Sequence, residues 1–436
     1  MKKTDHYTSA LDELFDLQRF SLKMGLDNIT RLCQFLGNPQ QAYSTIHIAG
    51  TNGKGSTAIM IQKILAGHGL RTGLYTSPHL IDFRERIRID QELIAPAFIS
   101  DFWEKMVAEV TALKATFFDT TTAMAFKYFQ EKNVDAAVIE TGLGGRLDST
   151  NILHPEAVVL TPIHIDHIPQ LGAELKNIAA EKAAIIKDGV ALFCADQLPE
   201  VEEVIREFST GITAEYLLGQ AVGCHITSCS ARGTIFDFAD KLRQESFSDL
   251  RLNLLGEFQV GNALLAYLTA RWFLEKRSIR FNPDILIKVF DQIQWPGRLQ
   301  RISQRPLIYF DVSHNYSGFE TTLEFIRSNY NPAATVLLLG LLADKEYERI
   351  VQLIVKDFKR VIVTEPDNER KLGTEVLAAV FNKYGIRADL IKNPRQAFDF
   401  CVKNMNRDEV LFVMGSHFLV GELSKDINEK SLTYNL

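Results

Sequence analysis

The residues with the clearest chemical meaning lie in one glycine-rich turn, HIAGTNGKGST, which runs from His47 to Thr57. A hydrophobic run leads into this turn, and a helical run follows it at once. Glycines let backbone N–H groups approach phosphate oxygens, and the N-terminus of the following helix adds its positive end. Lys54 can reach the β- and γ-phosphates of a nucleotide, and Ser56 or Thr57 can offer a hydroxyl group to Mg²⁺. Gly55 makes the spacing depart from G-x-x-x-x-G-K-[ST], but a glycine-rich turn between strand and helix still favours a nucleotide site.

Three further residues could serve the same chemistry. Glu140 ends a hydrophobic strand, where a carboxylate can hold Mg²⁺ or can simply be a solvated acid. His167 follows the run VVLTPIHID, and an isolated histidine is more often a structural hydrogen-bond donor than a metal ligand. Lys182 lies in the apolar helical segment EKAAIIK, where a surface cation is the ordinary interpretation. Taken alone, these three residues leave both interpretations open.

The elements that must position these residues alternate between strand and helix. Strands are expected at 44–50, 74–77, 136–140, 157–161 and 191–194, and helices at 56–68, 120–131 and 177–186. The first forty residues look helical and end at the helix-breaking LGNPQ. Strand, phosphate loop, helix and strand in this order make a βαβ unit. The pattern therefore predicts a largely parallel sheet covered by helices on both faces.

The second half of the chain changes character twice. Residues 211–255 look like short strands with polar turns, which predicts a small antiparallel flap. Pro and Gly then interrupt the pattern in WPGRLQRI, at 295–302, and strand–helix alternation restarts beyond it. We therefore expect two α/β domains joined by a hinge near 295–298. The first, 1–297, is a P-loop ATPase-like domain with a mostly parallel sheet, and the second, 298–436, is smaller and Rossmann-like.

Composition limits the classes of function. A length of 436 residues exceeds what one hydrophobic core usually serves. The 48 Lys and Arg residues against 54 Asp and Glu give a net charge of −6, which argues against a nucleic-acid partner. Five scattered cysteines, an N-terminus unlike a signal peptide and the absence of an 18-residue apolar run predict a cytoplasmic protein without a membrane partner. We expect a monomer that acts on small molecules.

Several motifs together resemble a known family. GTNGKGS is similar to the variant phosphate loop of the Mur ligase superfamily, whose members form peptide-like bonds with ATP. Within that superfamily, the chain resembles the bacterial dihydrofolate synthase/folylpolyglutamate synthase family. The segments that carry this resemblance are, in order, LGNPQ, TSPHL, RERIRI, ETGLGGRLDSTN, IDHIPQLG, EKAAIIK, LLGEFQVGNALLA, WPGR, DVSHN and MGSHFLVGE. Any one of them could arise by chance, but their order and spacing together are specific.

The resemblance implies a set of site residues. For ATP it implies Gly50, Thr51, Asn52, Gly53, Lys54, Gly55, Ser56, Thr57, Asn262, Arg298, Asp311 and His314, although a helix cap would explain Asn262 equally well. For one or two Mg²⁺ ions it implies Ser56, Ser77, Glu140, His167 and a carbamylated Lys182, and a monovalent cation is a further expectation. For the pterin it implies Phe118, Asp119, Arg146 and Asp148, and the catalytic residues are Lys54, His167 and Lys182.

The resemblance also implies the reaction. It is ATP-dependent ligation of L-glutamate to dihydropteroate, to reduced folates, or to both, through an acyl phosphate, with release of ADP and phosphate. A peptidoglycan ligase of the Mur type is the alternative in the same class, and the pterin-side segments count against it. A catalytically silent ATP-binding regulator would not need Lys54, Glu140, His167 and Lys182 intact. A P-loop kinase would not need a second α/β domain of this kind.

Overall fold

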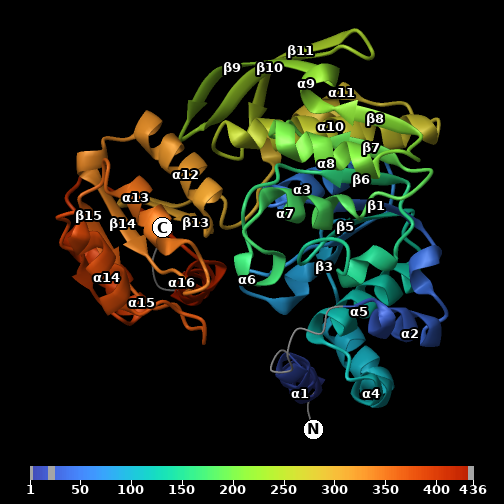
Figure 1. The fold of residues 1–436 in the computed structure, drawn as a ribbon, viewed down its shortest axis with the longest axis horizontal. Helices are drawn as coiled ribbons and strands as arrows, with labels where there is room; N and C mark the ends of the chain where they lie inside the picture. Colours follow the sequence, from blue (N-terminus) through green and yellow to red (C-terminus); the bar gives the residue numbers. More distant parts are fainter. Residues whose placement is uncertain (1–2, 18–24, 431–436) are drawn as a thin grey trace.

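Two separate sheets organise the chain, and the computed structural model describes residues 3–17 and 25–430 (Figure 1). The N-terminal sheet has the order β4-β3-β2-β5-β1-β6-β7-β8. Its strands are β1 (Ser44–Ala49), β2 (Thr72–Tyr75), β3 (Ile87–Ile89), β4 (Glu92–Leu93), β5 (Ala136–Glu140), β6 (Ala157–Leu160), β7 (Ala191–Cys194) and β8 (Ala214–Leu217). All are parallel except β3 and β4, which extend one edge as antiparallel strands. The predicted parallel sheet is confirmed.

Helices cover both faces of this sheet because the strand side chains alternate between them. On one face, Val138 joins a cluster that α3, α10 and α11 cover, and on the other face Ile139 packs beneath α1, α2, α4 and α5. Another cluster lies beneath α7 and α8. The helix bounds are α1 (Lys3–Asp16), α2 (Asp27–Phe35), α3 (Lys54–Gly67), α4 (Pro96–Leu113), α5 (Phe117–Glu131), α6 (Ile168–Leu171), α7 (Leu175–Ala183), α8 (Pro199–Phe208), α9 (Leu218–Ala221), α10 (Phe258–Lys276) and α11 (Pro283–Gln292).

The predicted flap is a three-stranded antiparallel sheet in the order β11-β10-β9. Its strands are β9 (Val222–Ser230), β10 (Gly233–Asp240) and β11 (Glu245–Leu252). Figure 1 shows this sheet at the top of the molecule, where it leans toward the C-terminal domain. The flap contacts that domain, because Arg301 Nη1 donates a hydrogen bond to the carbonyl of Ala231 at 3.4 Å.

The C-terminal sheet has the order β12-β13-β17-β14-β15-β16. Its strands are β12 (Gln300–Gln304), β13 (Leu307–Asp311), β14 (Thr335–Leu339), β15 (Arg360–Val363), β16 (Asp389–Leu390) and β17 (Val410–Met414). The accompanying helices are α12 (Tyr316–Asn329), α13 (Tyr347–Ile354), α14 (Thr374–Lys383), α15 (Pro394–Asn404) and α16 (His417–Lys430). The expected strand–helix alternation is confirmed, but β12 was not predicted and pairs antiparallel with β13.

Element boundaries differ from the predicted ones in detail. The helix after the phosphate loop begins at Lys54 instead of Ser56, so the lysine belongs to the first helical turn. Within the described part of the first forty residues, α1 (Lys3–Asp16) and α2 (Asp27–Phe35) are helical, as predicted. No helix within residues 3–17 and 25–430 is long and apolar enough to cross a membrane.

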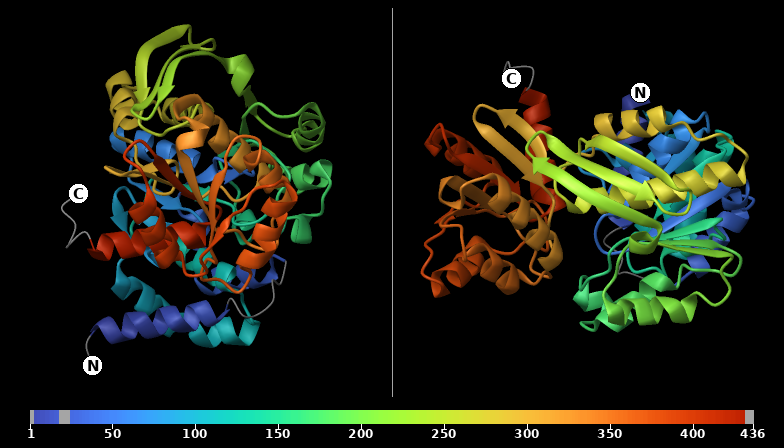
Figure 2. Two further views of the ribbon diagram at one scale, coloured as in Figure 1. Left: turned by 90° about the vertical axis from the view of Figure 1, so that its left-hand side faces the viewer. Right: turned by 90° about the horizontal axis from the view of Figure 1, so that it is seen from above.

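Figure 2 shows the two α/β units side by side, and the carboxyl ends of strands from both units carry residues that line one cavity. The phosphate loop follows β1, Glu140 ends β5, and Asp311 ends β13. Ligands of open α/β sheets bind outside this edge of the strands. Both edges contribute to one cavity beside the phosphate loop, so the fold places a site between the two units.

Candidate active site

The backbone of the phosphate loop packs so closely against its neighbours that two of its positions require glycine. Gly50 has a φ of 149°, and a Cβ there would lie 1.9 Å from Thr161 Oγ1. Gly53, at the N-cap of α3, has a φ of 88°, and a Cβ would lie 2.3 Å from Asn262 Oδ1. A side chain at either position would therefore combine backbone strain with a steric clash. The contact with Gly53 places Asn262 against the loop.

Two lysine side chains converge on one carbonyl oxygen of this loop. Lys54 Nζ donates hydrogen bonds to the carbonyls of Gly50 and Thr51, each at 3.1 Å, and Lys182 Nζ donates to the same Gly50 oxygen at 2.9 Å. Lys182 is only 4% exposed, and burial together with the nearby charge of Lys54 lowers its pKa to about 7. Burial also lowers the pKa of Lys54, and Glu140 opposes this effect. Positive charge is thus concentrated where a nucleotide's phosphates would lie.

The loop that follows β6 fixes the other side of the phosphate loop. The Thr51 N–H donates to the carbonyl of Pro162 at 2.9 Å, and Thr51 Oγ1 exchanges hydrogen bonds with the backbone of His164 at 2.9 and 3.0 Å. His167, farther along this loop, has a φ of 54° and lines the cavity. Its pKa falls to about 3, chiefly because of burial, so the imidazole is neutral at pH 7 and can act as a ligand.

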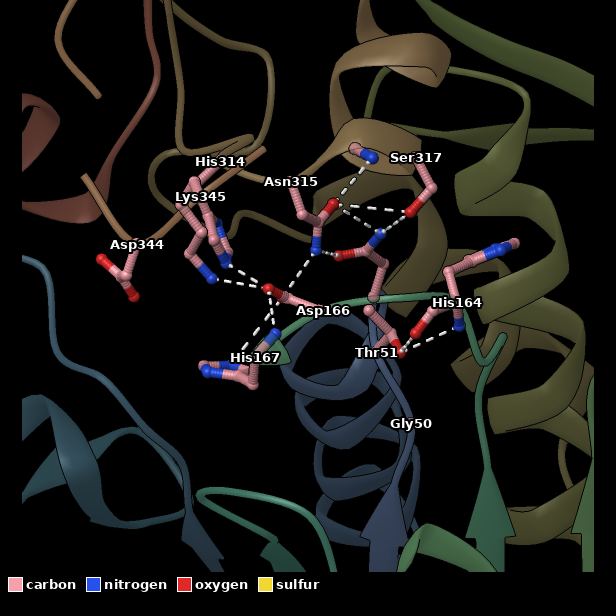
Figure 3. Close-up of polar contacts among 12 residues, drawn as sticks. Gly50, Thr51, His164, Asp166, His167, His314, Asn315, Ser317, Asp344 and Lys345 are labelled. Atoms are coloured by element: carbon pink, nitrogen blue, oxygen red, sulfur yellow. Dashed lines mark hydrogen bonds and ion pairs between the residues drawn. The ribbon is translucent and has the colours of Figure 1, made fainter. Parts of the chain in front are cut away.

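Asp166 joins this loop to the C-terminal domain (Figure 3). Its carboxylate accepts a hydrogen bond from Lys345 Nζ at 2.6 Å and from Asn315 Nδ2 at 2.8 Å, and His314 Nε2 lies 3.6 Å away. Burial alone would raise the pKa of Asp166, but His314, Lys345 and His167 hold this pKa far below its ordinary value. Asn315 also bonds to Asn52 in the phosphate loop, at 3.1 Å. One carboxylate thereby connects both domains beside the loop.

A cavity of about 320 Å³ opens between the two domains at this point. Most residues predicted for the nucleotide and the metal line it, namely Thr51, Asn52, Gly53, Lys54, Gly55, Ser56, Ser77, Glu140, His167, Asn262, Arg298, Asp311 and His314. Gly50, Thr57 and Lys182 do not line the cavity, and Thr57 and Lys182 are buried. Around this cavity the structure therefore brings together predicted residues that are up to 263 positions apart, from Thr51 to His314.

Oxygen atoms with unused bonding capacity mark a place for a divalent cation. Ser56 Oγ and Thr57 Oγ1 are buried and have no hydrogen-bond partner among the described residues. Glu140 Oε2 accepts a hydrogen bond from the Ser77 N–H at 3.2 Å, and burial raises the pKa of Glu140 against the influence of Lys54. No group of three His, Cys, Asp or Glu residues within the described chain could hold a metal by itself. Glu140, His167 and Ser56 fit Mg²⁺ if phosphate oxygens complete its coordination.

The residues predicted for the pterin lie beside this cavity and do not line it. Asp119 accepts hydrogen bonds from Thr116 and from Ser149 Oγ, the latter at 2.7 Å. Asp148 accepts the N–H groups of Gly142 and Leu143, both at 2.8 Å. Both carboxylates are buried and thus hold the loop after β5 in place. Their direct contact with a substrate stays a prediction.

The other two pterin-side residues are arranged differently. Arg146 is 46% exposed and forms an ion pair with Glu181 at 3.0 Å. Phe118 packs on Gly142, where a Cβ would lie 2.4 Å from the phenyl ring. Because Gly142 lines the cavity, this packing places the ring of Phe118 immediately behind the cavity wall. The contact of Phe118 with a pterin stays a prediction.

Sequence reasoning missed several residues of the site. Lys345, Asn315, Ser317 and His417 were not predicted as site residues, although Lys345, Ser317 and His417 line the cavity. Asn315 and His417 lie in DVSHN and MGSHFLVGE, which follow β13 and β17. The sequence did contain a signal for Asn315 and His417, because both follow predicted strands and the carboxyl ends of parallel strands meet at one edge of a sheet.

Comparison with known proteins identifies relatives along the whole chain. Residues 48–270 match the Mur ligase middle domain, and residues 297–417 match the Mur ligase glutamate ligase domain. The Bacillus subtilis (strain 168) dihydrofolate synthase/folylpolyglutamate synthase is 30% identical over 96% of this chain and 98% of its own. The Mycobacterium tuberculosis protein of the same name is 34% identical over 86% of this chain and 81% of its own.

Solved structures agree with these relatives. The Mycobacterium tuberculosis folylpolyglutamate synthase complexed with ADP has a TM-score of 0.89 at 29% identity, covering 97% of this chain and 98% of that one. A folylpolyglutamate synthase complex with AMPPCP and folate has a TM-score of 0.85 at 29% identity, covering 97% and 99%. The predicted fold class and family resemblance are confirmed.

The buried pair of Asp166 and Lys345 yields a stability prediction. Both side chains are 6% exposed, so Asp166→Ala leaves a buried ammonium group without its anion. We expect a loss of about 3–5 kcal/mol in the free energy of unfolding, and a smaller loss in the Asp166→Ala/Lys345→Met double variant. Denaturant titration of the singles and the double measures this coupling.

A matched control is the exposed pair of Lys176 and Glu203, whose atoms lie 2.7 Å apart at 53% and 61% exposure. Glu203→Ala should cost less than about 1 kcal/mol. Equal losses for Asp166→Ala and Glu203→Ala would contradict the buried connection between the domains.

Proposed function

The chain belongs to the dihydrofolate synthase/folylpolyglutamate synthase family of Mur ligases and is an ATP-dependent glutamate ligase, and from this premise we propose how its site performs the ligation. L-glutamate is joined to dihydropteroate and to reduced folates through an acyl phosphate. The observation that carries this proposal is the cavity between the domains, which the phosphate loop, Glu140, Arg298 and Asp311 line together. Small-molecule substrates and ATP fit a site of this size and charge.

The first step transfers the γ-phosphoryl group of ATP. A carboxylate oxygen of the substrate attacks the γ-phosphorus, and ADP leaves as the bond to its β-phosphate oxygen breaks. Such a transfer depends mostly on positioning and on neutralisation of charge. Lys54 already lies at the loop with its ammonium group held by two carbonyls, and Arg298 lines the same cavity from the linker between the domains. Both side chains would neutralise the negative charge of the phosphates during the transfer.

A bound Mg²⁺ would neutralise phosphate charge, and Glu140, His167, Ser56 and Ser77 would hold it. Lys182 cannot help as an ammonium group, because it would repel the metal. A carbamate on Lys182 would supply oxygen atoms, and the low pKa of this lysine supports that modification, which requires a neutral amine. A second Mg²⁺ and a monovalent cation belong to the same proposal.

The second step forms the amide bond. The amine of L-glutamate attacks the acyl carbon, loses a proton, and expels phosphate. Water would hydrolyse the intermediate, so the two domains must exclude it. The contacts of Asp166 and Asn52 with C-terminal residues support closure about the predicted hinge near 295–298. All five cysteines are free thiols, which supports a cytoplasmic enzyme.

We predict that Lys54→Ala abolishes turnover, with a rate loss on the order of 10²–10³ or more, because the transferred phosphoryl group loses a compensating charge. Phosphate release is measured with dihydropteroate plus glutamate and, side by side, with a reduced folate plus glutamate. Lys63→Ala, nine residues farther along α3, is the matched control, and circular dichroism checks both folds. Ligation near the wild-type rate in Lys54→Ala would refute the role of the loop.

The proposed carbamate makes turnover depend on pH and bicarbonate. With a pKa of about 7, Lys182 is mostly charged below pH 7 and mostly neutral above it, so carbamate and activity should both rise with pH. Spectra recorded with ¹³C-bicarbonate should show a carbamate carbon that Lys182→Ala lacks. The variant should lose activity, and a small carboxylate such as acetate should restore part of it.

Lys187→Ala is the control for this experiment, because Lys187 is a half-buried lysine in the same segment and lies outside the cavity lining. It should keep the carbamate signal and the activity. A wild-type spectrum without the carbamate carbon above pH 7 would rule out the modification.

A further inference from the structure

A second cavity, of about 510 Å³, lies between the flap and the linker that joins the two domains. Its volume falls within the range of small-molecule sites. The turn between β9 and β10, the end of β11 and the linker enclose it. Its lining includes Arg232, Arg251, Trp295, Pro296, Arg298 and Arg301.

All charged side chains that line this cavity are positive. Four arginines contribute to it, and none of the lining residues is Asp or Glu. Four guanidinium groups in one concave surface attract anions strongly and present planar donors that match carboxylates. The cavity is therefore built for an anionic ligand.

Many N–H donors of these guanidinium groups have no acceptor among the described residues. Arg232 makes no side-chain hydrogen bond or ion pair with another residue in the described part of the chain, and Arg301 makes one long bond to the carbonyl of Ala231. Arg251 donates to the carbonyl of Arg232 at 2.8 Å and lies 3.5 Å from Asp291, a half-exposed pair. Each guanidinium has five N–H donors, so most of them remain open to a ligand.

The arginine cavity connects with the active site through Trp295. Trp295, Pro296 and Arg298 also line a narrow cavity of about 40 Å³, which shares Glu140 and other residues with the nucleotide cavity. The Trp295 ring lies against the phosphate loop, since a Cβ on Gly55 would be 3.1 Å from its Nε1. Arg298 lines all three cavities, so a carboxylate chain could run from the phosphate loop past Trp295 to the arginines.

We propose that the arginine cavity binds the α-carboxylates of the γ-glutamyl tail of a substrate that is being elongated. This inference rests on the proposed function and specifies its substrate. When the terminal carboxylate of a tail is at the phosphate loop, each earlier glutamate still carries a free α-carboxylate. A row of such groups suits several arginines spread over three segments of chain, whereas one phosphate ion would need only one or two of them. Dihydropteroate, which lacks glutamate, would not use this cavity.

A binding experiment tests the cavity without the pterin. Tetra-γ-L-glutamate, titrated into the full-length protein by calorimetry, should bind, and added salt should weaken this binding. In the Arg232→Gln/Arg301→Gln double variant the affinity should fall by about tenfold or more. Arg395→Gln, which removes one positive charge from α15 outside the cavity as Arg232→Gln does from its lining, is the control and should bind as the wild type does. Arg232→Gln alone changes an exposed side chain and serves if the double variant does not fold.

Failure to bind the peptide in the wild type, or equal binding in the double variant, overturns the proposal. Inorganic phosphate that displaces the peptide at equal concentration would also overturn it, because the cavity would then be a simple anion site.

Steady-state kinetics separate this inference from the proposed function. The ratio of kcat/KM for a reduced folate triglutamate to kcat/KM for dihydropteroate should fall about tenfold in the double variant and stay constant in Arg395→Gln. If the wild type ligates glutamate to both substrates and the ratio does not change, the cavity has been assigned wrongly. If the wild type ligates glutamate to neither, the proposed function itself is wrong.

Discussion

Two lysine Nζ atoms on one carbonyl oxygen, that of Gly50, impose the constraint on which the rest of the site depends. Like charges in a buried position repel strongly because little water screens them. Burial and mutual repulsion lower the pKa of Lys182 to about 7, and burial lowers the pKa of Lys54 as well. Such a position is stable only if anions lie close by, and Glu140 and Asp166 are the carboxylates that supply this compensation. A polyphosphate is the ligand that best balances the positive charge that these two carboxylates leave uncompensated.

The same charge balance links the two domains. Asp166 stabilises the positive charge of Lys54 in the phosphate loop and of Lys182 in α7. On its other side it pairs with Lys345 of the C-terminal domain. Asn315 joins Asp166 and Asn52, so the phosphate loop, the loop after β6 and the start of α12 form one hydrogen-bonded unit. The contacts between the domains and the charge balance around the phosphate loop thus share one carboxylate, that of Asp166. A ligase needs this coupling, because its acyl phosphate must be protected from water.

Local patterns predicted the fold and many of the residues that surround one cavity between the domains, whereas long-range contacts could not be predicted from them. The glycines, Lys54 and Glu140 lie where a strand meets a turn, and such positions are visible in the sequence. Lys345 lies 179 residues from Asp166, and their pairing depends on how two separate sheets meet. β12 escaped prediction because an antiparallel edge strand beside a Pro-Gly turn looks like a linker. The internal hydrogen bonds of Asp119 and Asp148 likewise appear only once the loop after β5 packs against α5.

We propose that the protein joins a carboxylate to an amine through an acyl phosphate, and an isotope experiment tests this intermediate most directly. Dihydropteroate labelled with ¹⁸O in both carboxylate oxygens is incubated with ATP, L-glutamate and the protein, and the released phosphate is analysed by mass spectrometry. An acyl phosphate requires one labelled oxygen to pass from the carboxylate to phosphate in each turnover, and the account predicts this transfer. Ligation with release of unlabelled phosphate would contradict it.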